Sequence, residues 1–318
     1  MTTKQAPIHS GYGATTTARE VMGDKRLDGK VAIVTGGYVG VGLETTRVLA
    51  AAGATVIVPA RTREKARAAL SGMDRVELES VELSDPASVD GFASRFSASG
   101  RPLHLLINNA GIMAVPFAKT PQGFELQFAT NHLGHFQLTA RLWPALVRAE
   151  GARVVALSSR GHAFASVDLE DPSFERRPYD KWKAYGQSKS ANALFALALD
   201  AHGESRGVRA FSVHPGVVRT ELSRSVPEEE LRALRAGDPR AWKMPPEGAA
   251  TSVWCATSSA LDGMGGVYCE DVDIGEPLPA DSTERRGVRP WIMDRDLAER
   301  LWTKSQEWTT VRFEGGPK

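Results

Sequence analysis

The sequence has few of the features that mark secreted, membrane-spanning or nucleic-acid-binding proteins. Its 318 residues include only two cysteines, Cys255 and Cys269, and neither has the spacing of a metal ligand or redox motif, so we interpret both as reduced structural thiols. No apolar run approaches the roughly 18 residues of a membrane helix, and residues 1–26 lack the apolar segment of a signal peptide. The 39 Lys and Arg residues nearly balance the 38 Asp and Glu residues, which argues against general binding of nucleic acid. We expect a cytoplasmic protein with no membrane span.

The sequence does contain a regular alternation of short apolar runs and longer helical patterns. The apolar runs, expected as strands, cover residues 31–34, 55–58, 75–83, 103–107, 153–157, 208–213 and 267–269. The expected helices cover residues 41–52, 61–70, 86–98, 121–149, 179–206 and 246–256. Near-continuous apolar strands that alternate with helices indicate a mostly or fully parallel sheet covered on both faces. The predicted fold is therefore α/β, a single doubly wound Rossmann-like domain.

Two appendages and one insertion interrupt this pattern. We expect an irregular N-terminal arm at residues 1–28, the main domain at 29–275 and a C-terminal extension at 276–318 that packs on the same domain. Residues 217–243 are charged and long for a connection, which favours a functional lid. The lid has five apolar residues available to cover a ligand: Leu222, Val226, Leu231, Leu234 and Trp242. The extension is helical in pattern from Trp291 to Trp308; it could close the pocket, form a subunit contact or, most simply, pack on the core.

A glycine-rich loop follows the first expected strand and opens the first expected helix. Gly36, Gly40 and Gly42 have the spacing G-x-x-x-G-x-G. Glycines let the backbone approach a pyrophosphate closely, and a helix N-terminus offers it free N–H groups and partial positive charge. The position of the motif between a strand and a helix makes it specific. The residues predicted to bind a dinucleotide here are Gly36, Tyr38, Val39, Gly40 and Val41.

From this glycine spacing onward, the sequence resembles the short-chain dehydrogenase/reductase family over about residues 29–270. Further motifs stand in the family's order: Asn108-Asn109-Ala110-Gly111, Asn131, Ser158-Ser159, Tyr185-x-x-x-Lys189 and Pro215-Gly216. The motifs N-H-L-G-H and S-S-x-x-H are most similar to those of the subgroup that contains retinol dehydrogenases and their bacterial relatives. That subgroup favours lipophilic alcohols and carbonyls, so the resemblance implies a substrate of this kind.

The resemblance also implies a role for each motif. Asn109, Ala110 and Gly111 would bind the cofactor on its adenine side, whereas Pro215, Gly216, Val218 and Thr220 would line its nicotinamide side. The implied catalytic residues are Asn131, Ser159, Tyr185 and Lys189. Ser159, which aligns better than Ser158, would bind the substrate oxygen, and Asn131 would hold a water for proton relay. Lys189 would bind the ribose hydroxyls of the nicotinamide half.

The Tyr185 and Lys189 pair suits acid–base chemistry. Residues four apart share one face of a helix. A free tyrosine has a pKa of about 10, and a nearby ammonium group should lower the pKa of Tyr185 toward the operating pH. During carbonyl reduction Tyr185 would donate a proton to the substrate oxygen as hydride reaches the carbon, and Ser159 would stabilise the developing charge.

Three histidines, His132, His135 and His162, are alternative general bases. None has an evident carboxylate partner in the sequence, so packing and backbone hydrogen bonds are the simpler interpretation. No His, Cys or Asp cluster has metal-ligand spacing, and we expect no metal.

The end of the second expected strand bears on the choice between NADP(H) and NAD(H). NAD-specific relatives place an acid there, whereas this sequence has V-P-A-R ending in Arg61, whose guanidinium can bind a 2′-phosphate. We therefore expect NADP(H), with NAD(H) still possible because the glycine loop has Tyr38 and Val39 where many NADP-using relatives have a basic residue. Glu82 and Leu83 replace the usual Asp-Leu pair after the third strand, and Glu82 could accept from the adenine amino group.

The predicted function is hydride transfer between NADP(H) and an alcohol or carbonyl group of a small-molecule substrate. A sugar-nucleotide epimerase or dehydratase is disfavoured because Leu43 stands where the third glycine of those enzymes would fall. A non-catalytic NADP-binding regulator is disfavoured because Asn131, Ser159, Tyr185 and Lys189 are all present. A C=C reductase of the same family stays open, and so does a homodimer or homotetramer.

Overall fold

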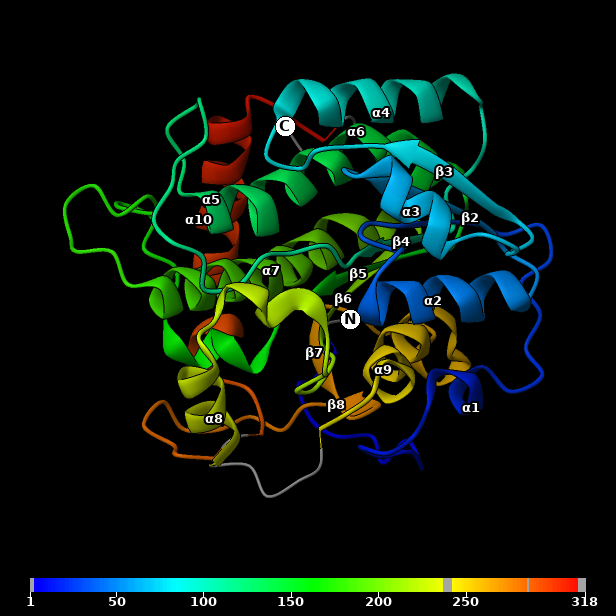
Figure 1. Ribbon diagram of the computed structural model, residues 1–318. Coiled ribbons are helices and arrows are strands. Elements are labelled where there is room, and N and C mark those ends of the chain that lie inside the picture. The colour runs from blue at the N-terminus through cyan, green and yellow to red at the C-terminus, as the bar shows by residue number, and fades with distance from the viewer. Residues whose placement is uncertain (1–2, 237–241, 285, 314–318) are drawn as a thin grey trace.

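A single mostly parallel sheet forms the centre of the molecule (Figure 1). The computed structural model describes residues 3–236, 242–284 and 286–313. Eight strands follow the order β3-β2-β1-β4-β5-β6-β7-β8. Their bounds are β1 Val31–Val34, β2 Thr55–Ala60, β3 Val76–Ser80, β4 Leu105–Asn108, β5 Ala152–Leu157, β6 Val208–His214, β7 Val267–Glu270 and β8 Asp273–Ile274. Strands β1 to β7 pair in parallel and β8 pairs antiparallel with β7, which confirms the expected doubly wound fold.

Helices cover both faces of the sheet because successive side chains of a strand point to opposite sides. One face carries α4 Pro86–Ala98, α6 Gly134–Arg148, α7 Lys181–Gly203 and α10 Arg295–Thr309; the other carries α1 Ala18–Met22, α2 Gly40–Ala51, α3 Arg63–Ala69 and α9 Pro245–Thr257. Within β1, Ile33 packs into the first apolar core and Val34 into the second. The sheet between two cores gives a rigid frame whose carboxyl edge carries the loops described below.

The predicted helix over residues 121–149 is wrong in its first part. Residues 120–124 form a turn in which Gly123 has a left-handed φ of +89° and donates its N–H to the Thr120 carbonyl. The buried Glu125 carboxylate then accepts from the first two free N–H groups of the helix, so α5, Leu126–Phe128, begins only there. A π-helical turn over Ala129–Leu133 joins α5 to α6. The left-handed glycine stops a helix that Pro121 would otherwise open.

The two chain ends differ from the expectation in detail. The arm is not irregular throughout, because α1 has a capping box of Thr17 and Glu20 and buries its apolar face against α9. In the extension, a 3-10 turn at Pro290–Ile292 precedes α10, and the Asp294 side chain caps the start of that helix. Helix α10 packs against α7 (Figure 1).

The lid, residues 217–243, leaves the sheet after β6 and returns before α9. It contains a 3-10 turn at Glu221–Ser225 and α8 at Glu228–Ala236. Its two ends are joined, since Lys243 donates to the Val217 carbonyl and accepts from the Arg219 N–H, each at 3.1 Å. Residues 237–241 and the side chain of Leu234 lie outside the described residues. None of the helices in the described ranges is both long and apolar enough to cross a membrane.

Candidate active site

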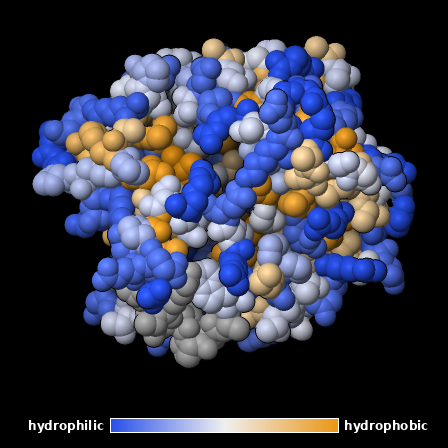
Figure 2. Space-filling view, in the orientation of Figure 1, coloured by the Kyte–Doolittle hydropathy of each residue, from blue (hydrophilic) through white to orange (hydrophobic). Residues whose placement is uncertain are grey.

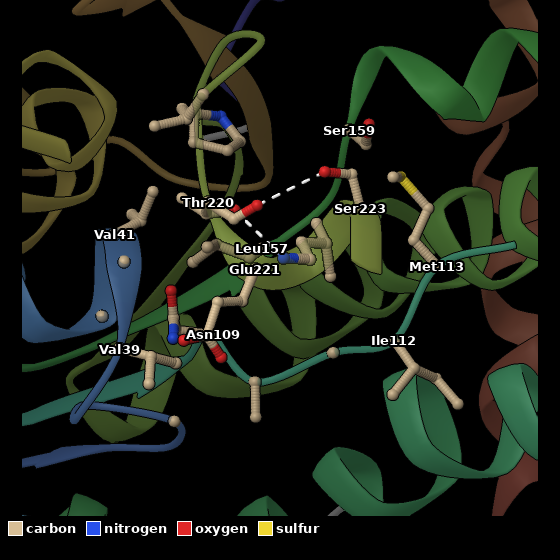
Figure 3. A pocket seen from close by; sticks show the side chains of 18 of the residues that line it. Val39, Val41, Asn109, Ile112, Met113, Leu157, Ser159, Thr220, Glu221 and Ser223 are labelled. Carbon is tan, nitrogen blue, oxygen red and sulfur yellow. Dashed lines mark hydrogen bonds between the residues drawn. The ribbon is translucent and has the colours of Figure 1, made fainter. Parts of the chain in front are cut away.

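A pocket of about 320 Å³ opens at the carboxyl ends of the central strands. It lies where the strand order reverses between β1 and β4, the usual ligand crevice of open parallel sheets. Apart from Asn131, every residue predicted to bind cofactor or act in catalysis lines this pocket: Gly36, Tyr38, Val39, Gly40, Val41, Arg61, Glu82, Leu83, Asn109, Ala110, Gly111, Ser159, Tyr185, Lys189, Pro215, Gly216, Val218 and Thr220. Figure 3 shows Val39, Val41 and Asn109 on one side of the pocket and Ile112 and Met113 on the other.

The glycine loop has the close backbone packing that a pyrophosphate site needs. Gly36 and Gly40 have φ values of +64° and +51°, in the left-handed region that glycine adopts without strain. A Cβ on Gly42 would lie 2.4 Å from the Asn109 amide nitrogen and from the Gly36 carbonyl. Helix α2 begins at Gly40 after Val39, which cannot cap it, so the first N–H groups of the helix have no side-chain partner. The chain therefore fits a dinucleotide phosphate at this loop.

Thr35 joins the glycine loop to the segment after β4. Its hydroxyl accepts from the N–H groups of Asn109 at 2.9 Å and Ala110 at 3.0 Å. The Asn109 side chain donates to the Thr35 carbonyl at 2.8 Å. The Thr35 hydroxyl also contacts the His135 ring at 2.9 Å. These bonds hold the two loops together at the floor of the pocket.

Tyr185, Ser159 and Lys189 meet in the same pocket. The Asp180 side chain caps α7, and Tyr185 and Lys189 follow on one face of that helix. The Lys189 Nζ atom lies 5.7 Å from the centre of the Tyr185 ring and donates to the Leu157 carbonyl at 2.9 Å. Ser159 and Tyr185 both lie against Gly161, and Ser159 acts to lower the pKa of the phenol, whereas the neighbouring Ser158 hydroxyl donates to the Lys189 carbonyl at 2.7 Å. Ser159 is thus the serine placed beside the phenol.

Burial dominates the electrostatics of this pair. It raises the pKa of Tyr185 to about 12, although the nearby Ser159 acts in the opposite direction. Burial also lowers the pKa of Lys189 to about 8. The expectation that the pKa of Tyr185 lies below its ordinary value, closer to the operating pH, is therefore wrong. Loss of solvent disfavours the phenolate more strongly than Ser159 favours it.

Asn131 lies in the π-helical turn and stands behind the pocket. Its side-chain amide donates to the Ile112 carbonyl at 3.0 Å and to the Ser188 hydroxyl at 2.9 Å. Its side-chain oxygen accepts from the Ile112 N–H at 2.9 Å. Asn131 thereby ties the segment after Gly111 to α7, and its water-relay role stays a prediction.

The three histidines considered as general bases are all buried and bound to protein groups. His132 contacts the Ser305 hydroxyl, His135 the Asn131 carbonyl, and His162 the Ser159 carbonyl. Burial lowers their pKa values to about 3, 4 and 4, respectively. None of the three lines the pocket, so each is a neutral structural group.

Charged residues surround the adenosine end of the pocket. Arg61 lies 3.6 Å from Glu82 and has a side chain that is 62% exposed. Glu82 accepts from the backbone and hydroxyl of Ser84, so its carboxylate already has protein partners where the sequence suggested an adenine amino group. Glu221 of the lid also lines the pocket, and it pairs with Lys65 of α3 at 2.5 Å. Nothing in the spacing of the sequence indicates this pair.

The opposite end of the pocket is apolar and partly covered by the lid. Of the predicted lid residues, Leu222, Leu231 and Trp242 line the pocket, whereas Val226 packs with Leu231 and Ala114 behind it. Among the lining residues that sequence reasoning missed are Met113, Phe164 and Trp182. They carry no motif of their own, and only their closeness to known motifs could have indicated them. In the view of Figure 2, hydrophobic side chains gather on the left of the molecule, the side on which α5 and α10 lie in Figure 1.

A glutamate of α8 links the lid to α7. Glu230 of α8 accepts from the Lys181 ammonium at 2.7 Å and from the Trp182 indole at 3.0 Å. Trp182 itself lines the pocket one turn before Tyr185. The described residues contain no group of three His, Cys, Asp or Glu side chains that could hold a metal ion.

Comparison with known proteins decides the family. The family model for short chain dehydrogenases matches residues 30–231. The chain belongs to the short-chain dehydrogenase/reductase family. It is 43% identical to a probable oxidoreductase of Streptomyces lividans, over 87% of this chain and 96% of that protein, and 38% identical to human retinol dehydrogenase 12, over 91% and 89%. A crystal structure of an uncharacterized protein from Mycobacterium paratuberculosis is 33% identical, with a TM-score of 0.73 and coverage of 92% and 98%. The family resemblance inferred from the sequence is confirmed, and the protein is an oxidoreductase of this family.

Proposed function

We propose that this oxidoreductase transfers hydride between NADP(H) and the alcohol or carbonyl group of a lipophilic substrate. One observation carries the proposal. Ser159, Tyr185 and Lys189 converge at the apolar end of a pocket whose other end is a glycine loop suited to a dinucleotide. A substrate at the apolar end would therefore meet both the proton donor and the cofactor.

The chain supplies the proton and the charge stabilisation. The nicotinamide cofactor, when bound, would supply or accept the hydride. With a pKa near 12, Tyr185 keeps its proton at neutral pH and is able to donate it to a carbonyl oxygen. The Ser159 hydroxyl beside it would donate a second hydrogen bond to that oxygen as negative charge develops. Of the three N–H donors of Lys189, one is used by Leu157, so two are left for ribose hydroxyls.

Arg61 supports NADP(H) as the cofactor. Strand β2 ends in Pro59-Ala60 with no acid, so nothing at that position would repel a 2′-phosphate. Arg61 makes one ion pair at 3.6 Å and is mostly exposed, so its guanidinium is free to reorient toward a phosphate. A bidentate contact of this kind is charge-assisted and has the geometry that phosphates prefer.

The lining of the far end supports a lipophilic substrate. Met113, Phe164, Trp182, Leu231 and Trp242 present mostly apolar surface next to the catalytic residues. Binding sites of this composition gain most of their affinity from apolar burial. One relative is named for retinol, a lipophilic alcohol, which agrees with this lining.

The test is a panel of aldehydes, ketones and alcohols of increasing chain length, with NADPH or NADP and followed at the nicotinamide absorbance. We expect turnover that improves with substrate lipophilicity. Tyr185→Phe should lower kcat by about 10²–10⁴-fold, the usual contribution of a general acid, and leave NADPH binding unchanged. A Tyr185→Phe variant with full turnover would refute the mechanism. Product analysis distinguishes carbonyl from C=C reduction, and silence across the panel would favour a regulator.

A further inference from the structure

His162 lies directly behind Ser159, and both of its ring nitrogens are used. Nδ1 is 2.7 Å from the Ser159 carbonyl oxygen, which can only accept, so Nδ1 carries the hydrogen. Nε2 accepts from the backbone N–H of Arg289 at 3.3 Å. The ring is 1% exposed, and its edge packs on Tyr268 with centroids 5.0 Å apart. These partners define one tautomer and leave no ring nitrogen for a substrate.

The Arg289 side of this contact belongs to the C-terminal extension. The Trp291 indole donates to the His162 carbonyl at 3.1 Å and to the Ser190 hydroxyl of α7 at 3.3 Å. Val288 and Ile292 are buried and pack with Tyr268 and Ala193. Residues 288–292 therefore form a fixed surface against which the loop after β5 rests.

The other side of the same loop rests on Tyr185. A Cβ on Gly161 would lie 2.7 Å from the Tyr185 ring, and a Cβ on Gly186 would lie 2.7 Å from the Gly161 carbonyl. The Ser159 hydroxyl accepts from the Gly161 N–H at 3.0 Å, so the serine moves with this turn. A small shift of the loop would therefore change the separation of Ser159 and Tyr185.

We propose that His162 is a positioning residue that couples Ser159 to residues 288–292 and so sets the serine hydroxyl against Tyr185. This proposal rests on the proposed function, because it assigns His162 to the same reaction. It gives the C-terminal extension a role in the active site that core packing alone does not require. Burial keeps the ring neutral and lowers its pKa to about 4, which agrees with a fixed hydrogen-bond bridge.

Two substitutions of His162 test the bridge. His162→Asn places an amide N–H near the position of Nδ1 and retains the bond to Ser159, whereas His162→Phe retains a ring and removes both bonds. Because misplacement of about 1 Å can cost roughly 10²-fold in rate, we expect His162→Phe to lower kcat by about 10–100-fold with KM for NADPH unchanged. His162→Asn should recover most of kcat, and the pH profile should keep its shape in both variants.

Each kcat is divided by the number of sites that bind NADPH, measured by nicotinamide fluorescence, so that loss of folded protein is not counted as loss of rate. Trp291→Phe is a second route to the same loop, since it removes the indole N–H and keeps an aromatic ring. It should lower kcat by a smaller factor and add nothing to His162→Phe, because both act on one turn.

Three results would overturn the proposal. The first is a wild-type kcat per site in His162→Phe. The second is an equal loss of kcat in His162→Asn and His162→Phe, together with a missing limb in the pH profile. The third is full additivity of the effects of His162→Phe and Trp291→Phe on kcat. Should His162→Phe fail to fold, the Asn and Trp291 variants still decide between the bridge and a titrating base. Absence of wild-type turnover on the whole panel would instead refute the proposed function, and the positioning role with it.

Discussion

Gly161→Ala is the most direct test of the contact between the serine loop and Tyr185. The new Cβ would lie 2.7 Å from Cε1 and 2.9 Å from Cδ1 of Tyr185, closer than carbon atoms approach without strain. Gly161 does not have a left-handed φ, so an alanine meets a steric obstacle and no backbone penalty. Tyr185 is only 4% exposed, which leaves its ring little room to move away.

The size of the effect follows from this geometry. Ordinary contact begins near 3.4 Å, so the loop and the ring must separate by roughly 0.7 Å. Displacement on this scale in a catalytic site typically costs about 10- to 100-fold in rate. Overpacking of a buried site costs about 1–3 kcal/mol in the free energy of unfolding. We therefore expect kcat/KM to fall by about 10–100-fold in a variant that still folds.

The assay compares initial rates at the nicotinamide absorbance with unfolding in urea. Gly91→Ala is the matched control, because Gly91 lies inside α4 and a Cβ there meets only the Arg95 guanidinium at 3.5 Å. That control should raise stability by about 0.5–1 kcal/mol and leave the rate unchanged. In the Tyr185→Phe background, Gly161→Ala should add little further loss. Wild-type kcat/KM in Gly161→Ala would show that the loop position does not set the rate.

Three further predictions use the same assays. Arg61→Ala should raise KM for NADPH by about tenfold or more, as for loss of a charge-assisted contact, and leave KM for NADH nearly unchanged; equal effects would refute the role of Arg61. Glu230→Gln should loosen the lid and raise KM for the lipophilic substrate more than KM for NADPH. A rise in KM for NADPH alone would contradict the role of Glu230 in holding the lid to α7. Stability should fall as the pH drops from about 6.5 toward 4, because His132, His135, His162 and His214 have pKa values of about 3–4 when folded and take up protons more readily when unfolded. Each of these histidines contributes up to about 1.4 kcal/mol per pH unit, so His214→Asn should flatten the dependence of the unfolding free energy on pH.

Two predictions from the sequence, the start of the helix after Pro121 and the direction of the Tyr185 pKa, were wrong. Pro121 is typical of a first helical turn, but Gly123 and the Glu125 cap move the start of the helix to Leu126. The sequence shows that Lys189 is four residues from Tyr185, but it does not show how deeply both are buried. Burial, not the neighbouring charge, decides the direction in which the pKa of Tyr185 moves.

The order of residues was enough to predict the doubly wound fold, the glycine loop and the Tyr185-x-x-x-Lys189 pair. These features depend on strand and helix periodicity and on spacings within one loop or one helix turn, which the order of residues expresses directly. The tertiary structure was needed to show which distant groups meet around the pocket: Lys65 with Glu221, Trp182 with Glu230, and His162 with the Arg289 backbone. Those partners are 156, 48 and 127 residues apart, and only the packing of the lid and the C-terminal extension on the sheet brings them together.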